Sequence, residues 1–384
     1  MNPGVPLAWL QLTRDKRRFA AALAGIAFAA SLMLTQLGFE DALMSTSGML
    51  HTHMAADLVL ISPLYQFIIS PRSFTERRIY QVLGVDGVAS VEPLYLGQTA
   101  FKNPVDGSER TIFAVGFNPR SAALDLPGVA GNLEKIRNPG VILFDSIRRP
   151  EFGPVTENFQ KSGQVITELG GRRVEINGLF EMGTSFAIDG TVVMSDETFL
   201  QVIPFRQRGI IDVGLIRLKP GASAERTKAG IEQLLPRDVR VLTKAEFVEL
   251  ERHYWATFTP TGFIFKLGVV MALVVGCIIV YQILYSDVTE HLPEYATLKA
   301  MGYPDWYLYK LVIQEAFILS VLGYIPGALV SQLVYNISRD ATLLPLRMTL
   351  ARVIAVYVLT TFMCVLSAIL ATRRLKAADP AEIF

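Results

Sequence analysis

Cysteine, charge and catalytic motifs are all scarce in this sequence. Its two cysteines, Cys277 and Cys364, lie inside long apolar runs, so no disulfide framework organises the polar part of the chain. Charged residues make up 18% of the chain and the formal net charge is +1, which offers no broad basic face to a nucleic acid. There is no phosphate-binding Gly-x-x-x-x-Gly-Lys-Ser/Thr loop, Gly-x-Ser-x-Gly elbow or His-Glu-x-x-His pair. These absences argue against an enzyme, so we assign no catalytic residue.

Long apolar runs are abundant instead. Four of them, residues 19–39, 262–285, 308–335 and 353–372, have the length of about 20 residues that a helix needs to cross roughly 30 Å of hydrocarbon. The sequence therefore predicts an α-helical membrane protein with four transmembrane helices, one before and three after a polar region at 40–261. About 220 residues are enough for an ordinary core, so this region is expected to be a large α/β extracytoplasmic domain.

Lysine and arginine placement predicts the orientation. These residues cluster at 14–18, before the first span, and at 373–376, after the fourth. Both termini, residues 1–18 and 373–384, are therefore expected to be cytoplasmic in a bacterial inner membrane. The loop at 286–307 would then also be cytoplasmic. Arginines in and near the short periplasmic loop at 336–352 (Arg339, Arg347 and Arg352) oppose this orientation, but the two termini outnumber them.

Short β-branched segments separated by Pro and Gly indicate strands in the polar region. They are Ala56–Ser62, Val88–Phe101, Thr111–Phe117, Val141–Asp145, Arg172–Phe180, Thr191–Ser195, Ile211–Leu218 and Val239–Thr243. With helices expected at Ser73–Leu83 and Ser223–Leu235, two strand–helix–strand units predict one split α/β sheet. Residues 117–194 are read as a β-rich insertion. Helical stalks are expected at Asp41–His53, after the first span, and at Thr243–Trp255, before the second.

His51 and His53 form a His-x-His pair with Asp57 close behind. An extended strand would place both rings on one face as a pair of metal ligands, but no third ligand is evident. The favoured interpretation is two polar stalk residues at the membrane surface, with no metal site. Lys266 is expected to reach the outer interface, and Glu315 either to hydrogen-bond within the bundle or, as favoured, to mark the cytoplasmic boundary.

Small residues inside the spans predict close helix contacts. They are Ala20, Ala21, Ala24 and Gly25 in the first span and Gly323 and Gly327 in the third. Packing within this chain's own bundle and a dimer seam explain them equally well. Pro326 is expected to kink the third span.

A short mixed-charge stretch, LPEYATLKAMGY, follows the second span. Pro at the start, good helix formers and a Gly stop predict a helix of about two turns, which is too short to be stable alone in water and needs a surface to lie on. A loop helix that merely covers the membrane surface is the alternative. The residues concerned are Pro293, Glu294, Tyr295, Ala296, Thr297, Leu298, Lys299, Ala300, Met301 and Gly302.

Several segments resemble a known family. HLPEYATLKAMGYPDWYLYKLVIQEAFILSVLGYIPG (His291–Gly327) is similar to the signature of FtsX-like, MacB-type permeases of ABC transporters. RRLKAADPAEIF (Arg373–Phe384) resembles the tail of that family, and ASVEPLY (Ala89–Tyr95) a segment of its MacB-like periplasmic core domain. Within the family, the sequence looks like the DevC-type permeases of cyanobacterial heterocyst-glycolipid exporters.

The resemblance implies a mechanism and a set of partners. Residues Pro293–Gly302 would be the coupling helix, which docks on a separate ABC ATPase. ATP and Mg²⁺ would bind to that ATPase, and this chain would hold no cofactor. Two copies of the chain would pair in the lipid bilayer and drive hydrophobic or lipid-like cargo through a periplasmic membrane-fusion adaptor into an outer-membrane TolC-like channel.

The alternative is a non-transporting, FtsX-like signal transmitter that regulates a periplasmic partner. The large outer domain favours export over this alternative, and neighbouring genes for an adaptor and an ATPase would decide between them.

Overall fold

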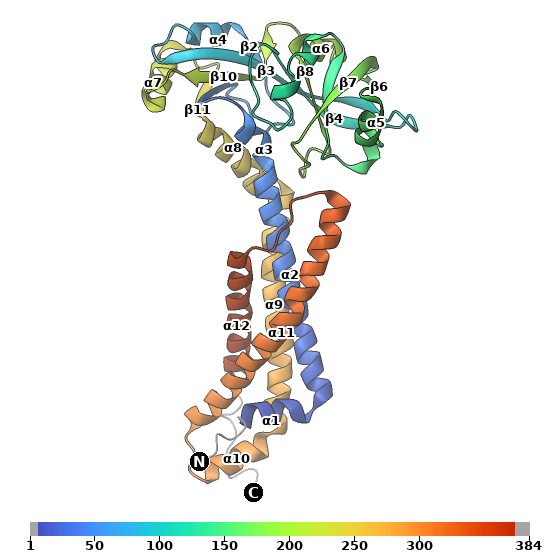
Figure 1. The fold of residues 1–384 in the computed structure, drawn as a ribbon. Coiled ribbons are helices and arrows are strands. Elements are labelled where there is room, and N and C mark those ends of the chain that lie inside the picture. Colours follow the sequence, from blue (N-terminus) through green and yellow to red (C-terminus); the bar gives the residue numbers. More distant parts are fainter. Residues whose placement is uncertain (1–6, 373–384) are drawn as a thin grey trace. The chain divides into compact units, whose positions relative to one another are not determined.

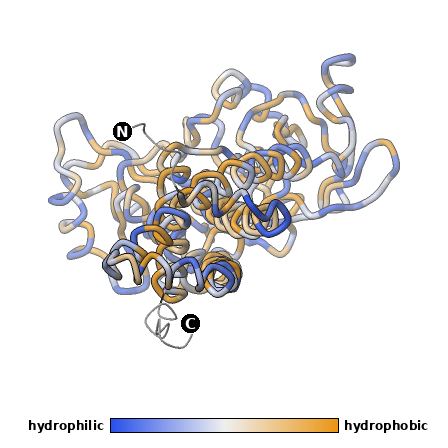
Figure 2. Tube along the Cα trace, turned by 90° about the horizontal axis from the view of Figure 1, so that it is seen from below, coloured by the Kyte–Doolittle hydropathy of each residue, from blue (hydrophilic) through white to orange (hydrophobic). Residues whose placement is uncertain are grey.

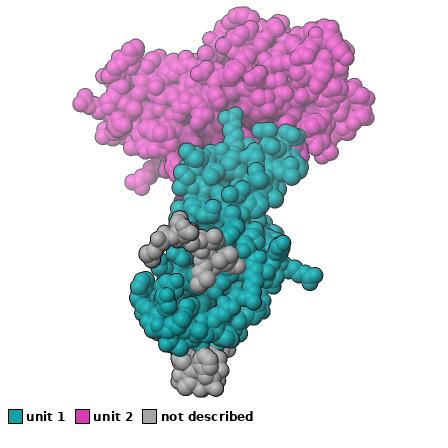
Figure 3. Space-filling model, turned by 60° about the horizontal axis from the view of Figure 1, so that its bottom comes forward, with its two compact units in different colours: residues 1–41, 260–340, 346–384 teal, residues 42–259, 341–345 magenta. Residues whose placement is uncertain are grey.

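The computed structural model describes residues 7–372 (Figure 1). The predicted cytoplasmic tail at 373–384 and residues 1–6 of the predicted N-terminal segment lie outside the described residues. The chain divides into two compact units, coloured separately in Figure 3. Unit 1 comprises residues 1–41, 260–340 and 346–384, and unit 2 comprises residues 42–259 and 341–345.

Long apolar helices build the described part of unit 1. Its helices are α1 (Leu7–Arg14), α2 (Lys16–Ser47, which continues into unit 2), α9 (Pro260–Glu290), α10 (Leu292–Ala300), α11 (Asp305–Thr342) and α12 (Leu350–Thr372). Four of them, α2, α9, α11 and α12, are long and apolar enough to cross a membrane, as predicted. Hydrophobic residues dominate these helices in Figure 2. Each of the four helices extends beyond its predicted span: α2 runs to Ser47, α9 to Glu290, and α11 passes through Pro326 as a helix to Thr342, while α12 begins at Leu350.

Unit 2 is built on a single nine-stranded sheet. Its strands follow the order β11-β1-β10-β3-β4-β8-β5-β7-β6. They are β1 (Leu58–Ile61), β3 (Val88–Lys102), β4 (Glu109–Phe117), β5 (Val141–Asp145), β6 (Val165–Leu169), β7 (Arg172–Phe180), β8 (Thr191–Ser195), β10 (Val213–Leu218) and β11 (Arg240–Thr243). A separate pair joins β2 (Phe74–Thr75) to β9 (Ile210–Ile211).

The two predicted strand–helix–strand units interleave in the first half of this sheet. In the first unit, β1, α4 (Arg77–Val82) and β3 follow in sequence, and β10 lies between the two strands. In the second, β10, α7 (Ala224–Leu234) and β11 follow in sequence, and β1 lies between the strands. The neighbouring pairs are antiparallel, so this is the split α/β sheet that the repeat predicted. The helix expected at Ser73–Leu83 is shorter than predicted, because residues 74–75 form β2.

The inserted strands close a small barrel. Strands β3, β4, β8, β5, β7 and β6 follow one another, and β6 pairs back to β3 through Phe101 and Leu169. Phe101, Phe144 and Phe152 contact one another in its buried core. The insertion is β-rich, as predicted. Its first strand, β4, begins at Glu109 and therefore lies before the predicted boundary at 117.

Short helices and turns complete unit 2. They are α3 (Met49–His53), α5 (Val155–Ser162), α6 (Asp196–Val202), α8 (Lys244–Thr257) and 3₁₀ turns at Ala130–Asn132, Lys135–Arg137 and Pro150–Phe152. The predicted stalks are helical: residues 41–53 fall in the end of α2 and in α3, and residues 244–255 fall in α8. Helix α8 begins at a capping box, in which Thr243 accepts from the Glu246 N–H and the Glu246 carboxylate accepts from the Thr243 N–H.

Candidate functional site

Local residues determine where helix α10, in the predicted coupling segment, begins and ends. Pro293 lies in the first turn, where its missing N–H is not needed, and Glu294 there complements the helix dipole. The helix stops at Gly302, whose φ of 90° suits glycine. Beyond the helix, the Tyr303 N–H donates to the Leu298 carbonyl at 3.2 Å, which satisfies one of the last carbonyl groups.

One face of α10 is anchored in unit 1. Tyr295 is 1% exposed and Ala296 is 3% exposed. Tyr295 belongs to a buried apolar cluster that also holds Leu12 of α1, Val288 of α9 and Leu308 of α11. Burial, reinforced by the nearby carboxyl of Glu315, raises the pKa of the Tyr295 phenol, so the ring remains neutral. Through this residue, α10 is fixed to three other helices.

The other face of α10 is exposed. Glu294, Thr297 and Ala300 lie on it, and the exposed surface continues beyond the helix end. There Met301 is 63% exposed and Trp306 is 62% exposed. The segment that follows the short helix therefore presents an apolar edge to its surroundings.

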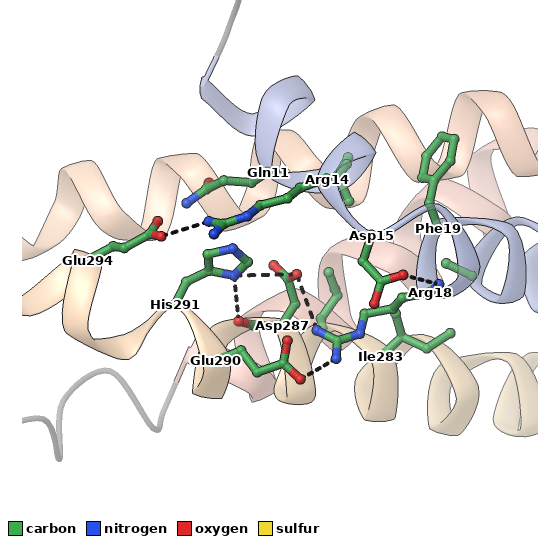
Figure 4. Close-up of a pocket in the computed structure, with 13 residues that line it drawn as sticks. Gln11, Arg14, Asp15, Arg18, Phe19, Ile283, Asp287, Glu290, His291 and Glu294 are labelled. Atoms are coloured by element: carbon green, nitrogen blue, oxygen red, sulfur yellow. Dashed lines mark hydrogen bonds and ion pairs between the residues drawn. The ribbon is translucent and has the colours of Figure 1, made fainter.

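Two ion pairs join the N-terminal helices to the start of α10 and to the end of α9 (Figure 4). Arg14 pairs with Glu294 at 3.1 Å, and Arg18 pairs with Glu290 at the end of α9. The His291 ring nitrogen Nδ1 lies 3.0 Å from the backbone oxygen of Asp287. The sequence indicated neither α1 nor these pairs, because the partners are about 280 residues apart in the chain.

The small residues of the spans make contacts within this chain. A Cβ added at Gly25 would lie 2.5 Å from Ile279, one at Gly323 would lie 2.7 Å from Ile26, and one at Gly327 would lie 2.7 Å from the Ala27 backbone oxygen. These three glycines therefore allow α2 to approach α9 and α11. Ala20, Ala21 and Ala24, by contrast, are exposed.

Glu315 lies inside the bundle. Its side chain is fully buried in α11 and lies within electrostatic reach of Asp287 near the end of α9, as the alternative of a contact within the bundle predicted. Its place at the cytoplasmic boundary of the membrane stays a prediction. The sequence reading missed Asp287 because it ended the second span before this residue.

Arg352, one of the arginines that opposed the predicted orientation, lies at the other end of the membrane-length part of α2, and its contacts account for its position there. Arg352 is buried near the start of α12 and donates to Asp41 at 2.6 Å and to the Tyr335 hydroxyl at 3.1 Å. Its charge is therefore neutralised within the chain. Lys266 is half exposed and lies 4.0 Å from Glu40.

His51 and His53 do not form a ligand pair, because they lie on a helix and point to different partners. His53 Nδ1 lies 2.7 Å from the Asp125 carbonyl oxygen, whereas His51 is fully buried, with Nε2 3.5 Å from Glu251. His51 is thus not a surface residue as expected. Within residues 7–372, no group of three or more His, Cys, Asp or Glu side chains is placed to hold a metal ion.

Glu251 of α8 is the centre of this buried cluster in unit 2. Its carboxylate accepts from the Ile68 N–H at 3.0 Å, the Trp255 indole at 3.0 Å and the Tyr65 hydroxyl at 3.3 Å. Burial raises the pKa of Glu251 to about 7 and lowers the pKa of His51 to about 3. Glu251 comes four residues after Phe247, so the two side chains lie on the same face of α8. This spacing was the sequence signal that could have located Glu251.

Two family models match the chain. Residues 19–234 match the MacB-like periplasmic core domain, and residues 266–380 match the FtsX-like permease C-terminal region. The first match covers more than half of the chain. The chain belongs to the MacB-like periplasmic core domain family. With its four membrane-length helices and the large α/β unit after the first of them, it is a membrane protein of the MacB/FtsX type.

Curated relatives are distant. Two uncharacterized ABC transporter permeases, from two strains of Mycobacterium tuberculosis, are each 21% identical to this MacB-type chain over 218 residues. The match covers 56% of this chain and 56% of each relative, so the chain spans little more than half the length of the relatives it matches.

Solved structures overlap with about half of the chain. The periplasmic region of MacB from Actinobacillus actinomycetemcomitans is 9% identical with a TM-score of 0.37, and covers 51% of this chain and 92% of its own. The extracellular domain of the noncanonic ABC-type transporter YknZ from Gram-positive bacteria is 17% identical with a TM-score of 0.34, and the match covers 49% of this chain and 99% of that domain.

Proposed function

We propose that this chain is the permease subunit of an ABC-type exporter and that it transmits motion from a separate ATPase to unit 2. The observation that carries this proposal is the two-faced structure of α10. A coupling element must be fixed to the membrane helices on one side and be open to a partner on the other. Buried Tyr295 and Ala296 meet the first requirement, and the exposed edge from Ala300 to Trp306 meets the second.

In this proposal α10 and both termini face the cytoplasm. Two chains pair in the membrane, each with one ATPase, and unit 2 acts on a membrane-fusion adaptor joined to an outer-membrane TolC-like channel. The curated relatives, which are named ABC transporter permeases, support the ATPase partner.

Hydrophobic or lipid-like cargo, such as the glycolipid of DevC-type exporters, suits the charge distribution of the helices. In the described part of unit 1, the fully or nearly buried Asp, Glu, Lys and Arg residues are Asp287, Glu315 and Arg352. They form no continuous charged path along the bundle, because Arg352 pairs with Asp41 at the opposite end from the Asp287 and Glu315 pair. A polar cargo would need such a path to cross the bilayer through this chain.

The test replaces the exposed face of α10 without disturbing its buried face. Full-length chain carrying Ala300→Arg or Thr297→Arg, both at exposed positions of α10, is reconstituted in nanodiscs with the ABC ATPase that co-purifies with the wild type. We expect each variant to reduce permease-dependent stimulation of ATP hydrolysis at least about tenfold, corresponding to about 1.4 kcal/mol of docking free energy.

The matched control is Phe205→Arg, a basic replacement at an exposed apolar residue of unit 2, which should leave stimulation unchanged. Wild-type stimulation in both α10 variants would exclude α10 as the coupling element. Normal stimulation without any export of lipid-like cargo would instead favour a transmitter of signals.

A further inference from the structure

A cleft of about 250 Å³ opens beside α10 in unit 1 (Figure 4). It lies among α1, the start of α2, the end of α9 and the first turn of α10. A single water needs only about 10–15 Å³ of such space, so the cleft has room for a larger polar group.

The lining of the cleft combines polar and apolar side chains. Arg14, Arg18, Glu290 and Glu294 line its polar part. Its apolar part is lined by side chains such as Phe19 and Ala22 of α2 and Ile283 and Leu284 of α9. Both α2 and α9 have the length and hydropathy of membrane spans. A ligand that fills the cleft must therefore join a polar group to an apolar body.

The charge of the lining selects among such ligands. Two guanidinium groups, of Arg14 and Arg18, face four carboxylates, of Asp15, Asp287, Glu290 and Glu294. Leaving His291 aside, this excess of two negative charges opposes a purely anionic headgroup. A zwitterionic headgroup fits better, because its phosphate can bind an arginine while its cationic group replaces that arginine beside a carboxylate.

A buried acceptor adds a second, independent requirement. Gln11 of α1 is 8% exposed and lines the cleft, and its side-chain oxygen Oε1 has no hydrogen-bond partner among residues 7–372. The Gln11 amide lies beside the Tyr295 hydroxyl. An unpaired buried oxygen is costly, so a ligand with an N–H donor gains by binding there. A primary ammonium has three such donors, whereas a trimethylated ammonium has none.

We propose that this cleft binds the headgroup of a phospholipid that carries a primary amine, of the phosphatidylethanolamine class. The ammonium lies beside Gln11 and the carboxylates of Glu290 and Glu294, the phosphate binds Arg14 or Arg18, and the acyl chains follow the apolar side chains of α2 and α9. A lysine side chain of a soluble partner would satisfy the ammonium requirement but would leave the apolar part unfilled. This inference does not depend on the proposed transport function.

The experiment measures lipid binding to the full-length chain by native mass spectrometry after delipidation in detergent. Phosphatidylethanolamine, phosphatidylcholine and phosphatidylglycerol with identical acyl chains are titrated separately. We expect phosphatidylethanolamine to bind at least about tenfold more tightly than the other two. The double variant Q11L/E290Q should lose this preference.

The matched control is Glu168→Gln, which removes a carboxylate that pairs with Lys102 in unit 2, and it should keep the preference. Thermal unfolding of each variant shows whether it has folded. If the double variant does not fold, the single variant E290Q takes its place, and it should weaken phosphatidylethanolamine binding severalfold. Equal binding of the three lipids by wild type, or an undiminished preference in a folded variant, would overturn the proposal. So would the absence of lipid binding together with a cross-link from residue 294 to a lysine of the ATPase.

Discussion

Replacing Glu251 with Gln should change how the stability of unit 2 depends on pH. The pKa of Glu251 rises from 4.5 to about 7 because the carboxyl is buried. The folded protein thus holds this proton more tightly than the unfolded chain. The resulting stabilisation is complete below pH 4.5 and is lost as the pH rises to about 7.

The size of the effect follows from those two pKa values. A shift from 4.5 to about 7 corresponds to about 3 kcal/mol in total, of which about 2.5 kcal/mol falls between pH 5 and pH 8. His51 works in the opposite direction, because its lowered pKa reduces stability as the pH falls below 6.5. Since the E251Q variant keeps His51, comparing it with wild type largely cancels that contribution.

Thermal unfolding of the full-length chain in detergent, followed by Trp255 fluorescence, provides the assay. Trp255 donates to Glu251 and reports directly on the cluster, once Trp9 and Trp306 are replaced by Phe. Relative to wild type, E251Q should gain about 5 to 10 °C in midpoint between pH 5 and pH 8. Any hydrogen bond lost with the carboxylate shifts the midpoint by a similar amount at both pH values.

The control is Glu249→Gln, which changes an exposed carboxylate on the same helix and should show no such pH-dependent gain. Parallel pH profiles for wild type and E251Q would refute the argument. They would mean that Glu251 remains ionised throughout, held in that state by His51 or by water in the cluster.

Asp41→Asn should lower the midpoint of thermal unfolding, because it leaves the buried Arg352 charge unpaired, at a cost of up to about 3–5 kcal/mol. Arg352→Met removes that buried charge, so it should raise the midpoint or lower it by less. A larger loss with Arg352→Met would contradict this reasoning. Gly327→Val should lower the midpoint in detergent without changing the oligomeric state seen by light scattering, since its new Cβ meets the Ala27 backbone. Dissociation of a dimer at an unchanged midpoint would instead favour a dimer seam. Phe101→Ala should cost unit 2 about 3–5 kcal/mol in unfolding free energy, and a loss below 1 kcal/mol would show that barrel closure contributes little.

Residue patterns predicted the elements that carry a strong local signal. Segments Val141–Asp145, Arg172–Phe180 and Thr191–Ser195 are strands with the bounds that the sequence indicated. The first and third are buried along their whole length, which is why their central residues are all apolar. Strand β6, VITEL, was missed because its alternation of buried and exposed residues covers only five positions, which is too short to stand out from a loop sequence.

What the sequence did not predict depends on partners that are distant in the chain. Barrel closure rests on the pairing of Phe101 with Leu169, and helix α1 on burial of Leu12 against Tyr295. No local pattern contains such information. The buried Glu251 is different, since it could have been found from its place on the apolar face of α8. The coupling role of Pro293–Gly302 came from the resemblance alone and remains a prediction.

Strand β3 restricts how this domain can vary in length. Its first residues pair with β10 up to Leu94, and from Leu94 onward the same strand pairs with β4. Tyr95 packs into one of the two hydrophobic cores and Leu96 into the other. Deleting a single residue between Val91 and Leu94 would exchange the sides of every later side chain in the strand. Insertions and deletions in homologous chains should therefore gather in the turn at 103–108 and spare the strand.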